Sequence, residues 1–452
     1  MDKIQLLQER KAIIADASKE IREDVFAIID EGSFVELSAF SFSKSEFYGA
    51  DATGEGVLTG YATIDGFAFY VVAQNYKVLD GGMTKANCDK IVKCLDMAEK
   101  NNVPVLLLLN THGVQVGEGV TVLEGLGKLL AKCAVNPPKY IVINGEVYGA
   151  AAMLASIAEC SIFLENKSVL AVNSPFVLSA KAGKNLTKEE VGGAKALDKT
   201  GIPTFTAKDL ADVREKIIAM NTMDAEPIIE AELNVSAPAL NEAANLENLL
   251  AIFENPVELN AIFEPQVKTL FGRIGGISVA AIVFDGGEEG VELNAAKFAK
   301  LKDFLKLVYI RELPLIVFGN VKGICPCACV NNSRVLKDAA EYLELFTALN
   351  TPKIAVVYKK AVGLGYTLFA SKSIGFDYTC AFANASIALF DGAQGAQIEF
   401  GNSGVDKAAL AAKYADENSD PVNAAKDGYI DAIIEPQFVK QYVIASLQML
   451  AE

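Results

Sequence analysis

The groups in this sequence that are best suited to chemistry are backbone N–H groups in two stretches that end in small residues. Each stretch follows an apolar, β-branched run and precedes a helix-like segment: NPPKYIVINGEVYGAA at 136–151 and NTPKIAVVYKKAVGLG at 350–365. A small-residue turn between a strand and a helix leaves backbone N–H groups unpaired, with the helix dipole behind them. Such donors can form an oxyanion hole, and small side chains let a ligand approach the backbone. One such turn alone is more typical of close helix–strand packing, so its weight here comes from being repeated.

Side chains suited to acid–base or nucleophilic chemistry are few. The chain of 452 residues contains a single histidine, His112. Schemes centred on histidine therefore have one candidate. No GxSxG elbow, Walker A motif or GxGxxG turn after a strand is found.

The cysteines are too sparse for a disulfide framework. Eight occur, and only the CPCAC run of Cys325, Cys327 and Cys329 is clustered. In an extended segment these three thiols would share one face and could hold a soft metal. No second Cys/His cluster completes such a set, so we favour thiols in a loop and expect no metal.

The chain is built from two copies of one plan. The turns above start 214 residues apart (350 − 136), and VPVLLLLNTHG at 103 and LPLIVFGNVKG at 313 are 210 apart. GYATIDGFAFYVV and LFGRIGGISVAAI, starting at Gly60 and Leu270, are also 210 apart. Ordered matches at nearly constant spacing indicate duplication. We predict a first domain at 1–225, a linker at 226–250 and a second domain at 251–452.

Strand-like and helix-like segments alternate, as in a layered α/β domain with crossover connections. A hairpin with an Asp65-Gly66 turn is expected at 57–75, and 104–109 is apolar throughout, as a strand covered on both faces should be. The other expected elements are helices at 1–30, 79–100, 118–133 and 149–160, strands at 139–144 and 161–165, a loop over a site at 41–56, and an excursion with two helices at 181–221.

Composition limits the partners. The formal net charge of −16 argues against nucleic acid or an anionic membrane as the main partner, although backbone amides can still bind a small anion. No run approaches 18 apolar residues, and the N-terminal MDKIQLLQERK lacks the apolar core of a signal peptide. We therefore expect no membrane insertion and a cytoplasmic protein.

Several segments in order resemble the biotin-dependent acyl-CoA carboxyltransferase β-subunits, the family that includes components of propionyl-CoA carboxylase and of methylmalonyl-CoA and glutaconyl-CoA decarboxylases. The segments are DEGSFVEL (30–37), GVLTGYATIDG (56–66), GGMTKANCDKI (81–91), LTKEEVGGA…TGIP (186–203), IALFDGAQGA (387–396) and GYIDAIIEPQFVKQYVIASLQML (428–450). The resemblance covers nearly the whole chain. It implies an α/β fold of two tandem, duplicated crotonase-like domains.

The resemblance also implies a mechanism that needs no histidine. Biotin on a separate carrier protein carries the carboxyl group, and one oxyanion hole serves biotin while another stabilises the enolate of the CoA thioester. By family position, Gly149 and Ala150 would serve the acyl-CoA carbonyl, and Leu364 and Gly365 would serve biotin. Further residues expected to line the substrate sites are Gly81, Gly82, Gly113, Gly323, Gly363 and Thr367. The family pattern implies a homo-oligomer, with first and second domains facing each other across a dimer and a hexamer as the usual assembly.

Departures from the family concentrate at these sites. Asn110-Thr111-His112-Gly113-Val114-Gln115 replaces Asp-Ser-Gly-Gly-Ala-Arg, so an Arg and a Gly are missing. Gly363-Leu364-Gly365 replaces Gly-Gly-Ala, where the Leu364 side chain could obstruct biotin. His112 is either a ligand contact in place of the lost Arg or a packed or surface histidine.

Two classes of function remain open from the sequence. The first is an active carboxyltransferase or acyl-CoA decarboxylase with an altered substrate, which we favour because small residues persist at both turns. The second is a non-catalytic subunit that assembles with an active paralogue. A crotonase-type hydratase is less favoured, since no pair of acids lies near either turn.

Overall fold

The computed structural model describes residues 2–41, 53–224, 234–401 and 406–450. The predicted site loop at 41–56 falls largely outside the described residues, as does the first part of the predicted linker at 226–250. The chain forms two compact units, residues 1–221 and 222–452, and each contains one sheet. The residue-level domain boundaries of the sequence analysis stay predictions.

The sheet of the first unit is mixed. Its described strands run in the order β1-β2-β3-β4-β5-β6-β8, and β7 pairs with the end of β5. The first three strands are antiparallel, and pairing from β3 onward is parallel. The strands are β1 (Val35–Leu37), β2 (Val57–Ile64), β3 (Phe67–Gln74), β4 (Val105–Thr111), β5 (Tyr140–Tyr148), β6 (Cys160–Leu164), β7 (Val169–Ala171) and β8 (Phe205–Ala207).

The sheet of the second unit follows the same plan. Its described order is β17-β15-β14-β13-β11-β10-β9, with β12 beside β13 and β16 beside the end of β14. The strands are β9 (Glu254–Leu259), β10 (Val267–Ile274), β11 (Ile277–Phe284), β12 (Val291–Leu293), β13 (Leu315–Ile324), β14 (Lys353–Val362), β15 (Tyr378–Phe382), β16 (Ser386–Ala388) and β17 (Ala432–Ile434).

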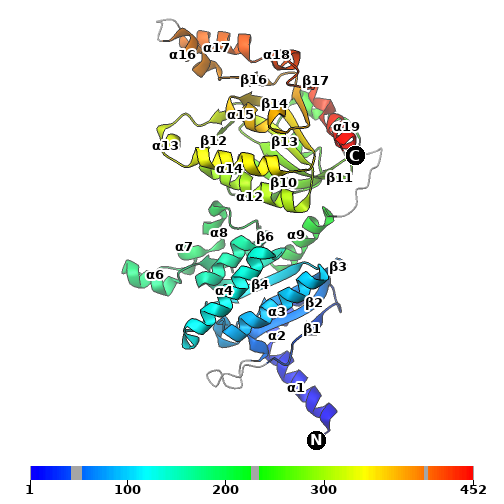
Figure 1. Ribbon diagram of the computed structural model, residues 1–452, viewed down its shortest axis with the longest axis vertical. Coiled ribbons are helices and arrows are strands. Elements are labelled where there is room, and N and C mark those ends of the chain that lie inside the picture. Colours follow the sequence, from blue (N-terminus) through cyan, green and yellow to red (C-terminus); the bar gives the residue numbers. More distant parts are fainter. Residues whose placement is uncertain (1, 42–52, 225–233, 402–405, 451–452) are drawn as a thin grey trace. The chain divides into compact units, whose positions relative to one another are not determined.

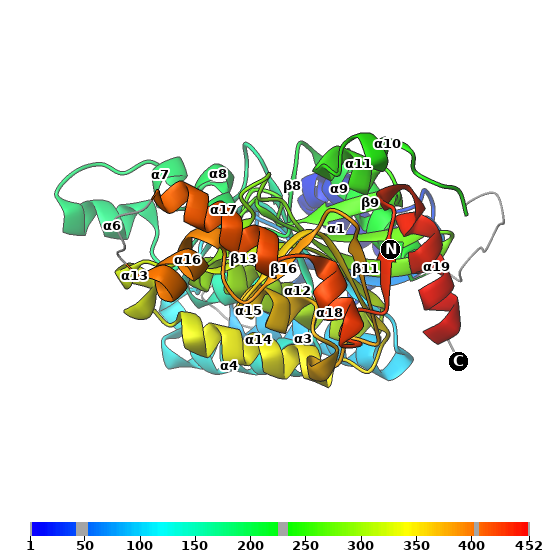
Figure 2. The ribbon, with the colours of Figure 1, turned by 90° about the horizontal axis from the view of Figure 1, so that it is seen from above.

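Helices flank each sheet, and in each unit one pair packs side by side: α3 with α4, and α12 with α14 (Figure 1). In the first unit the helices are α1 (Lys3–Ala17), α2 (Lys19–Phe26), α3 (Lys85–Asn101), α4 (Val120–Val135), α5 (Leu154–Ile157), α6 (Pro175–Ala182), α7 (Lys188–Gly192), α8 (Ala194–Leu197) and α9 (Leu210–Thr222). In the second unit they are α10 (Ala239–Glu242), α11 (Leu246–Leu250), α12 (Ala295–Arg311), α13 (Ala328–Asn331), α14 (Val335–Ala348), α15 (Leu364–Phe369), α16 (Gly392–Phe400), α17 (Lys407–Asn418), α18 (Pro421–Lys426) and α19 (Val439–Leu450). Helices α16 and α17 also pack against each other (Figure 2).

The structure confirms the internal repeat. Strands β2 and β3 and helix α3 recur as β10, β11 and α12, each exactly 210 residues later at both ends. The helix caps repeat as well. Thr84 and Asn294 each accept the N–H three residues ahead, and Asn102 and Glu312 each end their helix in a left-handed conformation. Such caps satisfy amides that the first turn leaves unpaired.

The predicted hairpin at 57–75 is also confirmed. Asp65 and Gly66 both have positive φ, as a two-residue turn of type I′ requires, and β2 pairs with β3 along its whole length. The carboxylate of Asp30 fixes this turn by accepting from the N–H groups of both turn residues. Arg214 also donates to Asp30, and these bonds hold the pKa of Asp30 far below its usual range although burial opposes them.

Other segments differ from expectation. The single helix predicted at 1–30 is replaced by α1 and α2, which are separated at Ser18, whose hydroxyl donates to the carbonyl of Ile14. The predicted helix at 149–160 is a 3₁₀ turn, Gly149–Met153, followed by the four-residue α5. None of the described helices is long and apolar enough to cross a membrane.

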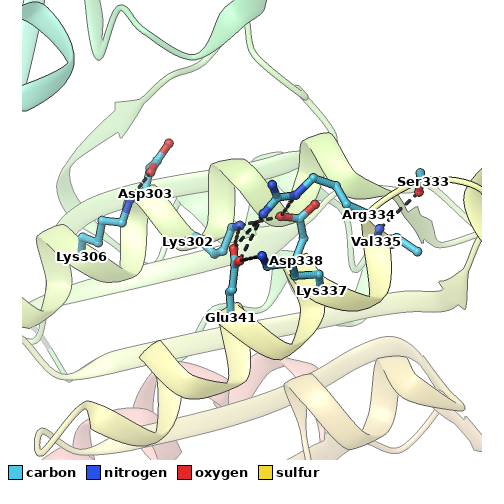
Figure 3. Close-up of polar contacts among 9 residues, drawn as sticks. All are labelled: Lys302, Asp303, Lys306, Ser333, Arg334, Val335, Lys337, Asp338 and Glu341. Carbon is cyan, nitrogen blue, oxygen red and sulfur yellow. Dashed lines mark hydrogen bonds and ion pairs between the residues drawn. The ribbon is translucent and has the colours of Figure 1, made fainter. Parts of the chain in front are cut away.

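Helices α12 and α14 are joined by a network of charged side chains (Figure 3). Asp338 accepts from Lys302 at 2.6 Å and from Arg334 at 3.0 Å, and Glu341 accepts from both cations as well. The Asp338 side chain is only 5% exposed and that of Lys302 13%. The network therefore holds the start of α14, close to the CPCAC segment in the chain.

Candidate active site

The first bend lies at the end of β5, where the chain turns into the 3₁₀ helix Gly149–Met153. Gly149 has φ +74°, a conformation that favours glycine, and nothing lies within 4 Å of the position its Cβ would take. Its N–H donates to the carbonyl of Val172 at 3.1 Å. This amide therefore already has an acceptor within the protein, and a role of Gly149 toward the acyl-CoA carbonyl stays a prediction.

Ala150 keeps the predicted property. It is exposed and lies in the first turn of the 3₁₀ helix, where an N–H has no partner within the helix. Ala151 follows it and is buried. The first backbone N–H that the bend can offer to a ligand is thus that of Ala150, one residue after Gly149.

The second bend repeats this geometry at the end of β14. Gly363 has φ +53°, and its N–H donates to the carbonyl of Ala388 at 3.0 Å. Leu364 and Gly365 open α15, so their N–H groups have no acceptor within the helix. The Leu364 side chain is 43% exposed at this bend.

A glycine supports each bend from the neighbouring strand. The Cβ position of Gly113 would lie 3.4 Å from the carbonyl of Tyr148, and that of Gly323 would lie 3.5 Å from the carbonyl of Val362. Both have φ above +100°. The N–H of Gly113 donates to the Thr111 hydroxyl at 3.0 Å, and a contact of Gly113 with the substrate stays a prediction. At each of these two glycines the positive φ and the close approach to a carbonyl at the end of the next strand disfavour a side chain.

Gly81 and Gly82 lie beside the start of the 110–115 loop. A Cβ on Gly81 would meet the Asn110 carbonyl at 2.5 Å, and one on Gly82 would meet the Gln115 side chain at 2.0 Å. Their amides donate to the carbonyls of Val78 and Leu79. Both glycines are therefore required by close packing, and their contact with CoA stays a prediction.

Gly365 and Thr367 also have protein contacts. A Cβ on Gly365 would meet the Val321 side chain at 2.8 Å and its carbonyl oxygen at 2.9 Å. The exposed Thr367 directs its hydroxyl to the Gly363 carbonyl at 3.3 Å. A substrate contact for Thr367 stays a prediction.

Sequence reasoning missed a cluster of titratable side chains at the first bend. His112, just after β4, lies with its Nε2 2.9 Å from the Tyr76 hydroxyl and 3.5 Å from a Glu146 carboxylate oxygen. Glu146 also accepts from Tyr148 at 2.9 Å and pairs with Lys188. Tyr76, His112, Glu146 and Lys188 follow one another in the sequence at separations of 34 to 42 residues. Only the spacing of the strand ends could therefore have indicated the cluster.

The charges of this cluster are set by its contacts. Burial favours the protonated form of Glu146, but the hydrogen bonds from Lys188 and Tyr148 outweigh it and keep the pKa of Glu146 below its usual range. Burial, together with the neighbouring Glu146, raises the pKa of both Tyr76 and Tyr148. Glu146 is therefore a carboxylate and both tyrosines are neutral phenols at pH 7.

The CPCAC run differs from the predicted loop of thiols. Cys327 and Cys329 form a disulfide, with Cα atoms 5.3 Å apart, and only Cys325 is free. That separation is in the range a disulfide needs. Among the residues that the structure describes, no group of three or more His, Cys, Asp or Glu side chains is arranged to hold a metal ion.

Comparison with known proteins assigns the chain to a family. Residues 15–452 match the family model described as the carboxyl transferase domain, and the chain belongs to this family. The α subunit of methylmalonyl-CoA decarboxylase from Veillonella parvula is 27% identical over 489 residues, covering 100% of this chain and 96% of that protein. The propionyl-CoA carboxylase β chain from Saccharopolyspora erythraea is also 27% identical, covering 97% of this chain and 88% of its own.

Solved structures support the fold. The structure of transcarboxylase 12S with methylmalonyl-CoA and methylmalonic acid bound matches with a TM-score of 0.90 and 22% identity, covering 99% of this chain and 94% of that one. A single-chain long-chain acyl-CoA carboxylase matches with a TM-score of 0.85 and 20% identity, covering 99% of this chain and 49% of that one. The predicted α/β fold of duplicated crotonase-like domains is confirmed.

Proposed function

We propose that this chain is the carboxyltransferase component of a biotin-dependent system and moves a carboxyl group between carrier-bound biotin and an acyl-CoA. The observation that carries the proposal is the family match over residues 15–452 in a chain whose two units present the same bend. The named relatives act on methylmalonyl-CoA and propionyl-CoA. Branched or short acyl-CoA thioesters are therefore the first substrates to consider.

The first bend would bind the thioester carbonyl. The N–H of Ala150 is placed to stabilise the enolate oxygen that forms when the α-carbon gains or loses its carboxyl group. The second bend fits the ureido oxygen of biotin, because the N–H groups of Leu364 and Gly365 both open α15. Biotin, when bound, supplies a carrier for the carboxyl group. Gly363 and Gly323 keep the backbone of this bend in place.

Assembly is part of the proposal. The transcarboxylase 12S structure is described as a hexamer, and we propose a homo-oligomer in which the first unit of one copy works with the second unit of another. A biotin carboxyl carrier protein is the proposed partner, and a cytoplasmic location is proposed with it. The alternative of a non-catalytic subunit gains no support from the comparisons, because the relatives are named as decarboxylase and carboxylase chains.

The test is a carboxyl-transfer assay. Purified protein is mixed with biotinylated carrier protein and, separately, malonyl-, methylmalonyl- and glutaconyl-CoA, and loss of the thioester carboxylate is followed. Loss that depends on the biotinylated carrier supports the proposal. No loss with any thioester, together with co-purification of a close relative, would instead favour the non-catalytic subunit.

A further inference from the structure

The cluster at the first bend has the composition of an acid–base site. Two oxygen atoms face Nε2 of His112: the Tyr76 hydroxyl at 2.9 Å and Glu146 Oε2 at 3.5 Å. The Tyr76 hydroxyl also lies 3.4 Å from Nδ1, and in the neutral imidazole one ring nitrogen carries the proton while the other keeps its lone pair. The His112 side chain is 44% exposed, so a ligand can reach the ring.

The cluster is held at the bend by the strands on either side. Tyr148 immediately precedes Gly149, and its ring centroid lies 6.0 Å from that of His112. His112 immediately precedes Gly113, whose Cβ position is 3.4 Å from the Tyr148 carbonyl. The imidazole is therefore carried by the same two loops that form the bend.

The fold itself does not require this cluster. In the second unit the positions 210 and 214 residues later are Lys322, Lys360 and Val362, in place of His112, Glu146 and Tyr148. The second bend has the same backbone with none of these acid–base partners. The cluster is thus a property of the first bend alone.

We infer that His112 is a catalytic acid–base residue of the first bend, which exchanges the α-hydrogen of a bound acyl-CoA with solvent and does so without biotin. This inference rests on the proposed function, because it needs the thioester carbonyl at the Ala150 amide. The unprotonated ring nitrogen of His112 takes the α-proton, and the electrons of the C–H bond form the enolate held at the bend. The imidazolium exchanges that proton with water and returns one to the α-carbon, which restores the thioester with no net reaction.

Glu146 is a positioning residue in this scheme. Its carboxylate stabilises the imidazolium that forms during the transfer and orients the ring through Nε2. Lys188 and Tyr148 keep it in the carboxylate form. Tyr76 is neutral, and its hydroxyl lies 2.9 Å from Nε2 and 3.4 Å from Nδ1 of the ring.

The experiment measures deuterium incorporation by mass spectrometry. The full chain is incubated in D₂O with acetyl-CoA or propionyl-CoA and no biotin. We expect exchange well above the buffer rate and a fall of about 10²-fold or more in His112→Ala, the usual contribution of a general base. Added imidazole should restore part of the exchange in that variant, which a structural role would not allow. Glu146→Gln should lower the exchange rate with little change in the Kd for acyl-CoA.

The control is Lys322→Ala, which changes the position equivalent to His112 in the second unit and should leave the exchange rate unchanged. Exchange no faster than buffer, equal exchange in His112→Ala, or no response to imidazole would each overturn the inference. The carboxyl-transfer assay reports on the proposed function separately, since carboxyl transfer without exchange refutes only the role of His112.

Discussion

The N–H of Gly149 donates to the carbonyl of Val172, which follows β7, and the N–H of Gly363 donates in the same way to Ala388 at the end of β16. In each unit the short strand that pairs with the end of a longer one, β7 beside β5 and β16 beside β14, thus ends at or next to the carbonyl that accepts from the glycine N–H. The first amides left for a ligand are those of the next residues, Ala150 and Leu364. The bends are therefore built alike, and each prediction about them concerns the residue after the glycine.

Removing the amide of Ala150 should remove activity without unfolding the protein. Proline lacks an N–H and is tolerated in the first turn of a helix. We expect Ala150→Pro to lower kcat for carboxyl transfer by about 10²- to 10³-fold, as loss of one oxyanion donor does. Ala150→Ser keeps the N–H and is the matched control. Loss of activity in both variants, or in neither, would count against a role for this amide.

Shortening Leu364 tests the second bend. Its side chain is exposed where the family has glycine, and Leu364 is the first residue of α15. We expect Leu364→Gly to lower the KM for biotin or its carrier several-fold and to leave the KM for acyl-CoA unchanged. The measurement is a steady-state carboxyl-transfer assay at varied biotin. An unchanged KM for biotin would show that the side chain does not crowd this site.

Gly365 should tolerate no side chain. A Cβ there would lie 2.8 Å from Val321 Cγ1 and 2.9 Å from the Val321 carbonyl oxygen. We expect Gly365→Ala to lower the free energy of unfolding by about 1–3 kcal/mol, the usual cost of overpacking. Urea denaturation gives the value.

The control for this change is Gly127→Ala in the middle of α4, where nothing lies within 4 Å of the Cβ position. Alanine there should raise stability by about 0.5–1 kcal/mol, because it restricts the unfolded chain and favours the helix. An equal effect at both positions would contradict the packing argument.

The duplicated fold could be predicted because the turn motif, the apolar run and the spacing between the two copies are all visible in the sequence itself. The hairpin at Asp65-Gly66, the apolar strand predicted at 104–109 and observed as β4, and the 210-residue offset all follow from pattern. The amide that each bend leaves free could not be predicted, because it depends on a carbonyl from another strand, such as Val172. The cluster around His112 depends on strand ends meeting in space, and the disulfide of Cys327 depends on the local path of a loop.

The network of Figure 3 should set part of the acid stability of the second unit. Asp338 is nearly buried, and the hydrogen bonds from Lys302 and Arg334 outweigh burial and hold its pKa below the usual range. A depressed folded-state pKa contributes stability that is present above the unfolded pKa of about 4 and is lost as the pH falls through the folded value. We expect Asp338→Asn to cost about 1–3 kcal/mol at pH 7, because Lys302 loses a charged partner. The difference in the free energy of unfolding between the wild-type protein and Asp338→Asn should shrink below about pH 4.

The control is Asp303→Asn, which breaks the exposed pair with Lys306 in the same view. It should change the free energy of unfolding by less than about 0.5 kcal/mol. A pH-independent difference for Asp338→Asn in urea denaturation would show that its charge contributes nothing to this unit.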